Sequence, residues 1–114
     1  MAILVIDDSI DFRASISILL ERSGFQSLQA DDGEIAIQIA QDHVIEAILC
    51  DMTMPDMSGA EVYHVLQQSE KTANIPFIFL TGLTQSDVPA GATYLQKPLK
   101  LDVLLQMLDK VIRH

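Results

Sequence analysis

Three acids, one hydroxyl and one lysine each follow an apolar stretch of this sequence. They are Asp7, Asp8, Asp51, Thr81 and Lys97. Two carboxylates about 4 Å apart repel each other by roughly 1 kcal/mol in water and by about 4 kcal/mol at an effective dielectric constant of 20. Three carboxylates at one place therefore need a cation, and an all-oxygen ligand set with room for water suits Mg²⁺. Such a site could let one carboxylate attack phosphorus, while the cation, lysine and hydroxyl stabilise the phosphoryl oxygens.

Each of these residues has an ordinary structural interpretation when it is taken alone. Asp8 or the nearby Asp11 could cap the helix that follows the first apolar run, and Thr81 could begin a turn. Asp51 could simply face water, and Lys97 could be a solvated lysine of a loop. These alternatives stay open for each residue singly. The shared placement after four separate apolar stretches nevertheless favours one functional site.

The elements that must position these residues alternate between apolar runs and stretches of helical periodicity. The predicted strands are 2–6, 25–30, 45–50, 76–80 and 93–96. The predicted helices are 11–23, 32–40, 58–69 and 101–112. This alternation predicts an α/β fold with a parallel sheet covered by helices on both faces, and the more polar second strand should lie at an edge. The functional crevice of such a sheet lies beyond the carboxyl ends of its strands.

The connection between the last two predicted strands is unusually short. Only 13 residues, 81–93, separate Leu80 from Tyr94, whereas a parallel crossover needs about a dozen residues or more and usually contains a helix. The segment 83–91 contains Pro89 and Gly91 and shows little apolar periodicity. We therefore expect the helix at this place to be reduced to a turn or lost.

Composition excludes several classes of protein. The 114 residues carry a net charge of −9, from 16 acids and 7 bases, without the clustered lysine and arginine that direct nucleic-acid binding needs. No apolar run approaches the ~20 residues of a membrane span. The single Cys50 allows no internal disulfide, and the three histidines stand apart. The expectation is one soluble, cytoplasmic domain over residues 1–114.

Four stretches of the sequence resemble the receiver domain of two-component response regulators. They are residues 3–9, 49–59, 79–82 and 94–98, which read ILVIDDS, LCDMTMPDMSG, FLTG and YLQKP. The motifs are specific as a set, and the resemblance covers essentially the whole chain. It implies a flavodoxin-like, doubly wound sheet of five parallel strands in the order 2-1-3-4-5.

The resemblance also implies roles for the residues of the predicted site. Asp51 resembles the phosphoacceptor of the family. Asp8 resembles the direct Mg²⁺ ligand, together with Asp51 and the main-chain carbonyl of Thr53, and Asp7 would act mostly through water. Lys97 resembles the lysine that pairs with a phosphoryl oxygen.

Two further residues resemble the switch of the family. Thr81 matches the hydroxyl that closes on the phosphoryl group. Tyr94, three residues before Lys97, matches the aromatic switch position, although a half-buried tyrosine of an edge strand is the structural alternative. The Lys97–Pro98 peptide bond resembles one that is cis in the family, a form that proline makes accessible.

The partners implied by the resemblance are proteins. A histidine kinase or a phosphotransfer protein would donate the phosphoryl group, and a downstream protein or effector domain would respond to it. The domain would supply catalytic groups for its own phosphorylation and dephosphorylation, without being an enzyme with a separate substrate. The fourth helix, fifth strand and fifth helix commonly form the output and dimer face of the family, so the short connection leaves dimerisation open.

Three other functions are alternatives to that of a phosphoacceptor domain. A protein-interaction module that never needs phosphorylation is favoured by the altered fourth-helix region. A phosphohydrolase with an aspartyl-phosphate intermediate requires a second acid two residues after the nucleophile. This chain has Thr53 at that position, which argues against this function. An FMN-binding flavodoxin requires a phosphate-binding loop rich in glycine, serine and threonine after the first strand. The sequence has no such loop after residues 2–6, which argues against this function.

Overall fold

Five parallel strands form the centre of the protein, whose computed structural model describes residues 2–82 and 88–112. The strands are β1 (Ala2–Ile6), β2 (Gln26–Ala30), β3 (Ile45–Asp51), β4 (Phe77–Thr81) and β5 (Thr93–Gln96). The helices are α1 (Ile10–Arg22), α2 (Gly33–Asp42), α3 (Gly59–Gln67) and α4 (Leu101–Ile112). The strand order β2-β1-β3-β4-β5 confirms the predicted flavodoxin-like fold.

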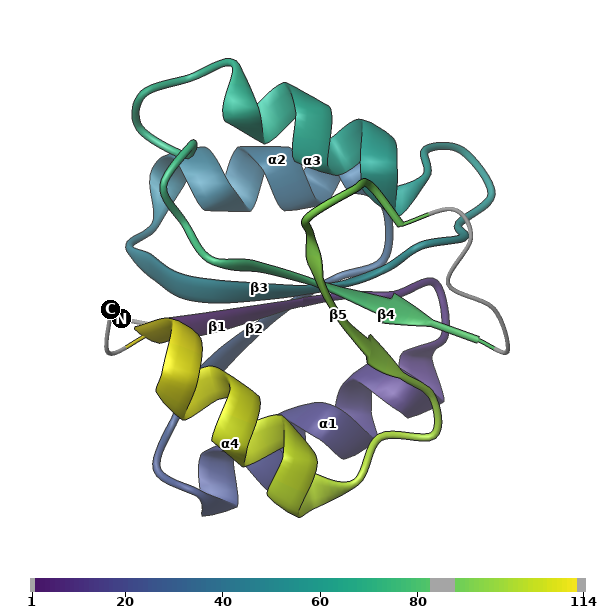
Figure 1. Cartoon of the computed structure of the whole chain (residues 1–114), viewed down its shortest axis with the longest axis vertical. Helices are drawn as coiled ribbons and strands as arrows, with labels where there is room; N and C mark the ends of the chain where they lie inside the picture. The colour runs from purple at the N-terminus through teal and green to yellow at the C-terminus, as the bar shows by residue number, and fades with distance from the viewer. Residues whose placement is uncertain (1, 83–87, 113–114) are drawn as a thin grey trace.

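The helices cover both faces of the sheet, so the core has two layers. Figure 1 shows α2 and α3 on one face and α1 and α4 on the other. Leu4 and Ile6 of β1 pack in the layer under α2 and α3, whereas Ile3 and Val5 pack in the layer over α1 and α4. Every residue of β1 is buried, as expected for a strand covered on both faces. The polar β2 lies at an edge, as predicted.

Serine and aspartate side chains cap the N-termini of three helices, at Ser9, Asp32 and Ser58. The Oγ of Ser9 accepts a hydrogen bond from the amide of Phe12 and caps α1, so the alternative that Asp8 or Asp11 caps this helix is wrong. Ser58 and Glu61 form a complete capping box at α3. Because Ser9 provides the cap, the Asp8 side chain is not needed at the start of the helix.

The connection from β4 to β5 contains no helix within its described part. Residues 88–92 form a bend and a turn, and Val88 and Ala92 pack against the core layer under α2 and α3. The rest of the segment predicted to lose its helix, residues 83–87, lies outside the described residues. Among the described helices, none is both long and apolar enough to cross a membrane.

Two buried hydroxyls allow a matched test of packing. The Oγ1 of Thr72 donates a 2.6 Å hydrogen bond to the carbonyl of Leu66, whereas the buried Oγ of Ser17 has no partner within the described part of the chain. Thr72→Val should therefore lower the free energy of unfolding by about 1–2 kcal/mol. Ser17→Ala should leave it unchanged or raise it. Urea denaturation of both variants checks this, and equal losses would contradict the assignment.

Candidate functional site

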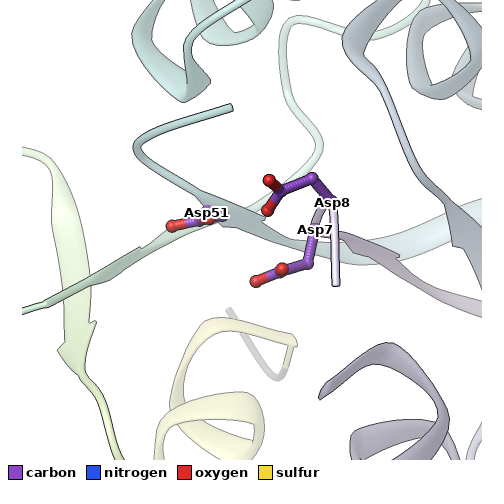
Figure 2. A group of neighbouring side chains, drawn as sticks. All are labelled: Asp7, Asp8 and Asp51. Atoms are coloured by element: carbon purple, nitrogen blue, oxygen red, sulfur yellow. The ribbon is translucent and has the colours of Figure 1, made fainter. Parts of the chain in front are cut away.

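The site lies at the carboxyl edge of the sheet, where neighbouring strands end side by side. Asp7 and Asp8 follow β1, and Asp51 is the last residue of the adjacent strand β3. Each of the three offers a carboxylate oxygen, and these oxygens all lie within 4.8 Å of one another. Figure 2 shows the three carboxylates projecting to the same side of the sheet edge. Asp7 is buried, Asp51 is half-buried and Asp8 is exposed, so the group opens to solvent at one side.

Lys97 reaches this group from the turn after β5. Its Nζ lies 2.7 Å from Asp7 Oδ2 and 3.7 Å from Asp51 Oδ1. The Lys97 amide donates a 2.7 Å hydrogen bond to the carbonyl of Thr81, which ties the turn to the end of β4. The Lys97–Pro98 bond is cis, as the resemblance implied. The ammonium is thus shared between two carboxylates and lies closer to the more deeply buried one.

Thr81 contributes a buried hydroxyl to the site. The residue ends β4 and is 3% exposed. Its Oγ1 makes no hydrogen bond within the described part of the chain. A buried hydroxyl that is not hydrogen-bonded costs free energy, so such groups in folded proteins call for an explanation. An anionic oxygen beside Asp51 would give this hydroxyl an acceptor.

Two other predicted site residues lie at the margin of the carboxylate group. Thr53 is exposed, and its amide lies 3.5 Å from Asp51 Oδ1 as a hydrogen-bond donor. Tyr94 lies on the edge strand β5 and is 39% exposed. This exposure is close to that expected if Tyr94 is only a half-buried tyrosine of an edge strand. The switch role of Tyr94 stays a prediction.

Two residues that sequence reasoning missed hold Asp7 in place. The amide of Ser9 donates a 2.9 Å hydrogen bond to Asp7 Oδ1, and Arg13 Nη1 donates a 2.8 Å hydrogen bond to the Asp7 carbonyl. A serine before a helical run is a known N-cap signal, so Ser9 could have been found. The contact of Arg13 depends on how α1 packs beside β1, and no sequence pattern reveals it.

Burial and neighbouring charges change the pKa of the Asp51 carboxyl. Burial raises the pKa of the Asp51 carboxyl above its ordinary value of 3.8, the Lys97 ammonium lowers it, and the Asp7 and Asp8 carboxylates raise it. The net result is a raised pKa. Burial, followed by the charges of Asp51 and Asp7, also raises the pKa of the Cys50 thiol. Cys50 therefore stays a neutral core residue and is no candidate nucleophile.

The raised pKa of Asp51 predicts how stability depends on pH in chelator-containing buffer. A carboxyl that binds its proton more tightly in the folded state stabilises the protein at low pH, and this contribution is lost as pH rises through the folded pKa. Relative to Asp51→Asn, the parent chain should therefore lose stability as pH rises from about 3 to about 7. Denaturant unfolding of both proteins across this range measures the difference. A parent that gains stability relative to the variant as pH rises would contradict the expectation.

The chemistry of the carboxylate group fits a hard divalent cation. All three side chains offer oxygen, and one side of the group is open to water. Mg²⁺ prefers such ligands and keeps several waters. Within the described residues, no other group of three or more acidic, histidine or cysteine side chains gathers in this way. Burial is the main cause of the raised pKa of Asp51, and the Asp7 and Asp8 carboxylates add repulsion that a bound cation would relieve.

Comparison with known proteins agrees with this geometry. Residues 3–109 match the response regulator receiver domain family. The chain is 32% identical, over 97% of its length, to the phosphate regulon transcriptional regulatory protein PhoB of Pseudomonas aeruginosa. It spans 51% of that relative, and 16% and 24% of two other curated relatives, so it corresponds to only part of each.

Solved structures superpose over almost the whole chain. The chemotaxis protein CheY4 of Vibrio cholerae is 31% identical, with a TM-score of 0.88 over 97% of this chain and 98% of that one. The receiver domain of the sensor histidine kinase PA1611 from Pseudomonas aeruginosa is 26% identical, with a TM-score of 0.92 over 99% of this chain and 98% of that one. The latter structure holds a magnesium ion coordinated in its active-site cleft.

Proposed function

Because this chain belongs to the response regulator receiver domain family, we propose that Asp51 accepts a phosphoryl group in a Mg²⁺-dependent reaction. The observation that carries the proposal is the meeting of three carboxylates with Lys97 at one sheet edge. Asp51 is the member of the group that is both partly open and in reach of the ammonium. We propose one receiver unit over residues 1–114, in the cytoplasm, with no direct contact to nucleic acid or membrane.

In the proposed step, an oxygen of Asp51 forms a bond to phosphorus while the bond from phosphorus to a donor imidazole nitrogen breaks. The electron pair of that bond stays on the imidazole nitrogen. Lys97 pairs with a phosphoryl oxygen, and the Thr81 hydroxyl, which has no hydrogen-bond partner among the described residues, donates a hydrogen bond to another. Both groups would stabilise the negative charge of the phosphoryl oxygens.

The residues present fit a Mg²⁺ site. Asp8, Asp51 and the main-chain carbonyl of Thr53 would hold the ion, and Asp7 would contribute through water. Both oxygens of Asp7 already have partners, the Ser9 amide and the Lys97 ammonium, which supports an indirect role. When bound, the ion supplies positive charge that lets an anionic phosphoryl group approach the carboxylates.

The consequence of phosphorylation is a shifted conformational equilibrium. Thr81 would move toward the phosphoryl group and Tyr94 would respond on the neighbouring edge strand. Moving such a switch from 1:99 to 99:1 needs about 5.5 kcal/mol of differential stabilisation, which is demanding for one modification, so we expect partial switching.

The donor and the receiver of the signal are proposed to be proteins. A histidine kinase or a phosphotransfer protein donates the phosphoryl group, and a downstream protein or effector domain reads the changed surface. PhoB is a transcriptional regulatory protein, and the PA1611 domain comes from a sensor kinase. The domain is no enzyme with a separate substrate, although it supplies the catalytic groups Asp51, Thr81 and Lys97 for its own phosphorylation and dephosphorylation.

A second candidate function is a protein-interaction module that does not need phosphorylation. The observation that favours it is the β4–β5 connection, whose described part at 88–92 is not helical. This part of the fold commonly carries output in the family. The two functions differ in one property, because only the phosphoacceptor is labelled by a small phosphodonor.

The experiment that tests the proposed function is intact-mass spectrometry after incubation with acetyl phosphate and Mg²⁺. The parent chain should gain the mass of one phosphoryl group, and EDTA should prevent the gain. Asp51→Asn should not be labelled, whereas Asp56→Asn, which changes an exposed acid of the same loop, should be labelled normally. A parent chain that gains no mass would favour the interaction module instead.

A further inference from the structure

The Lys97 ammonium has an aromatic neighbour in addition to its two carboxylates. The Nζ lies 4.2 Å from the centre of the Phe12 ring. Phe12 stands in the first turn of α1, and its amide is bound by the Ser9 cap. The ring is half-buried and packs against the core layer between the sheet and the helices α1 and α4. The position of Phe12 is therefore fixed at both its backbone and its ring.

A ring face attracts a cation because the π-electrons make the face negative. A carboxylate partner directs a hydrogen bond along one line, whereas a ring face attracts an ammonium without fixing where its N–H bonds point. The ring can thus keep Lys97 at the site while its hydrogen bonds change partners. In the unphosphorylated chain, Lys97 Nζ lies 2.7 Å from Asp7 Oδ2 but 3.7 Å from Asp51 Oδ1. The ammonium must therefore change its hydrogen-bond partner before it can pair with a phosphoryl group on Asp51.

We propose that Phe12 is a positioning residue that holds the Lys97 ammonium between Asp7 and Asp51, so that the ammonium can turn from the Asp7 carboxylate to a phosphoryl oxygen on Asp51. The inference rests on the proposed function. It adds α1 to the elements that determine the rate of phosphorylation, since the ring belongs to that helix.

The first test measures the rate constant of labelling by acetyl phosphate at saturating Mg²⁺. Phe12→Leu removes the ring and keeps an apolar side chain, and it should lower the rate constant about five-fold. Phe12→Tyr keeps the ring face and should stay within about two-fold of the parent. Phe25→Leu is the matched control, because Phe25 is also half-buried against the same core layer. Phe25 follows the C-terminal end of α1, at the other end of the helix from Phe12, and the rate constant of Phe25→Leu should match that of the parent.

A second measurement separates positioning from loss of packing. In a Lys97→Met background, Phe12→Leu should change the remaining rate constant of labelling by less than about two-fold, because the ammonium that the ring holds is gone. An equal five-fold loss in both backgrounds would overturn the inference. So would a Phe12→Leu variant that is labelled as fast as the parent, or a Phe12→Tyr variant that is as slow as Phe12→Leu.

A third measurement needs no Phe12 variant to fold. In the parent chain, the ring current of Phe12 should shift the Hε protons of Lys97 upfield, with the resonances assigned by their loss in Lys97→Arg. Unshifted resonances would overturn the inference even if labelling is normal. A parent chain that is not labelled at all, but shows the shifted resonances, would instead overturn the proposed function and with it the role of Phe12 in the reaction.

Discussion

Replacement of Lys97 by methionine is expected to lower the free energy of unfolding of the metal-free protein by about 2–3 kcal/mol. The Asp7 side chain is 1% exposed and would lose its ion pair while Asp8 and Asp51 remain nearby. Removing one partner of a fully buried pair costs more, but Lys97 is 27% exposed, which reduces the loss. Urea denaturation in the presence of EDTA measures the effect.

Two controls identify the cause of this loss. Lys100→Met changes an exposed lysine three residues further along and should alter the free energy of unfolding by no more than about 0.5 kcal/mol. Adding Asp7→Asn to Lys97→Met should recover part of the stability, because the buried charge is then removed. If Lys97→Met is as stable as the parent, the ion pair with Asp7 is not what stabilises this edge of the sheet.

Gly59→Ala is expected to lower the free energy of unfolding by about 1–3 kcal/mol and to slow phosphorylation of Asp51 by an order of magnitude or more. A Cβ at Gly59 would overlap the carbonyl oxygen of Asp51 and lie 3.1 Å from the Cα of Met52. These are backbone atoms, so the end of β3 must move to make room. The moved segment carries the carboxylate that must face phosphorus, and rates depend steeply on such alignment.

Denaturant unfolding and acetyl phosphate labelling of the Gly59→Ala variant check both parts of this expectation. Gly82→Ala is the matched control for stability, because a Cβ at Gly82 would meet no atom of the described residues beyond its chain neighbours within 4 Å. It should unfold like the parent. A Gly59→Ala variant that keeps both the stability and the labelling rate of the parent would show that α3 does not hold Asp51 in place.

The fold could be predicted because its signals are strong and repeated. The wholly apolar run of β1 requires cover on both faces, and the polar β2 requires an edge, so the layers follow from the sequence. The meeting of Asp7 with Asp51 follows from parallel strands that end at a common edge. The sequence alone therefore predicts which residue types gather at this edge of the sheet.

The contacts that tune the site could not be predicted in the same way. The Arg13 hydrogen bond to the Asp7 carbonyl and the Phe12 ring under Lys97 depend on the rotation of α1 against the sheet. Helical periodicity determines which face of a helix is buried, but not which side chain reaches a neighbouring strand end. Ser9 was missed because two acids beside it offered competing caps, and only the structure decides between adjacent capping residues.

The exposure of Tyr94 is a related case. Tyr94 of the edge strand β5 is exposed, whereas the next residue, Leu95, is buried. The resemblance to the family predicts a switch role for Tyr94, yet a match in sequence carries no information about how far an aromatic side chain turns inward.

The measurement that tests the central claim most directly is chemical mapping of the modified residue. After labelling with acetyl phosphate and Mg²⁺, borohydride reduction converts an aspartyl phosphate to homoserine, and tandem mass spectrometry of the peptides locates it. We expect homoserine at position 51 and unmodified aspartate at positions 7 and 8. A phosphoryl group that resists reduction, or homoserine at either of the other two acids, would contradict the account.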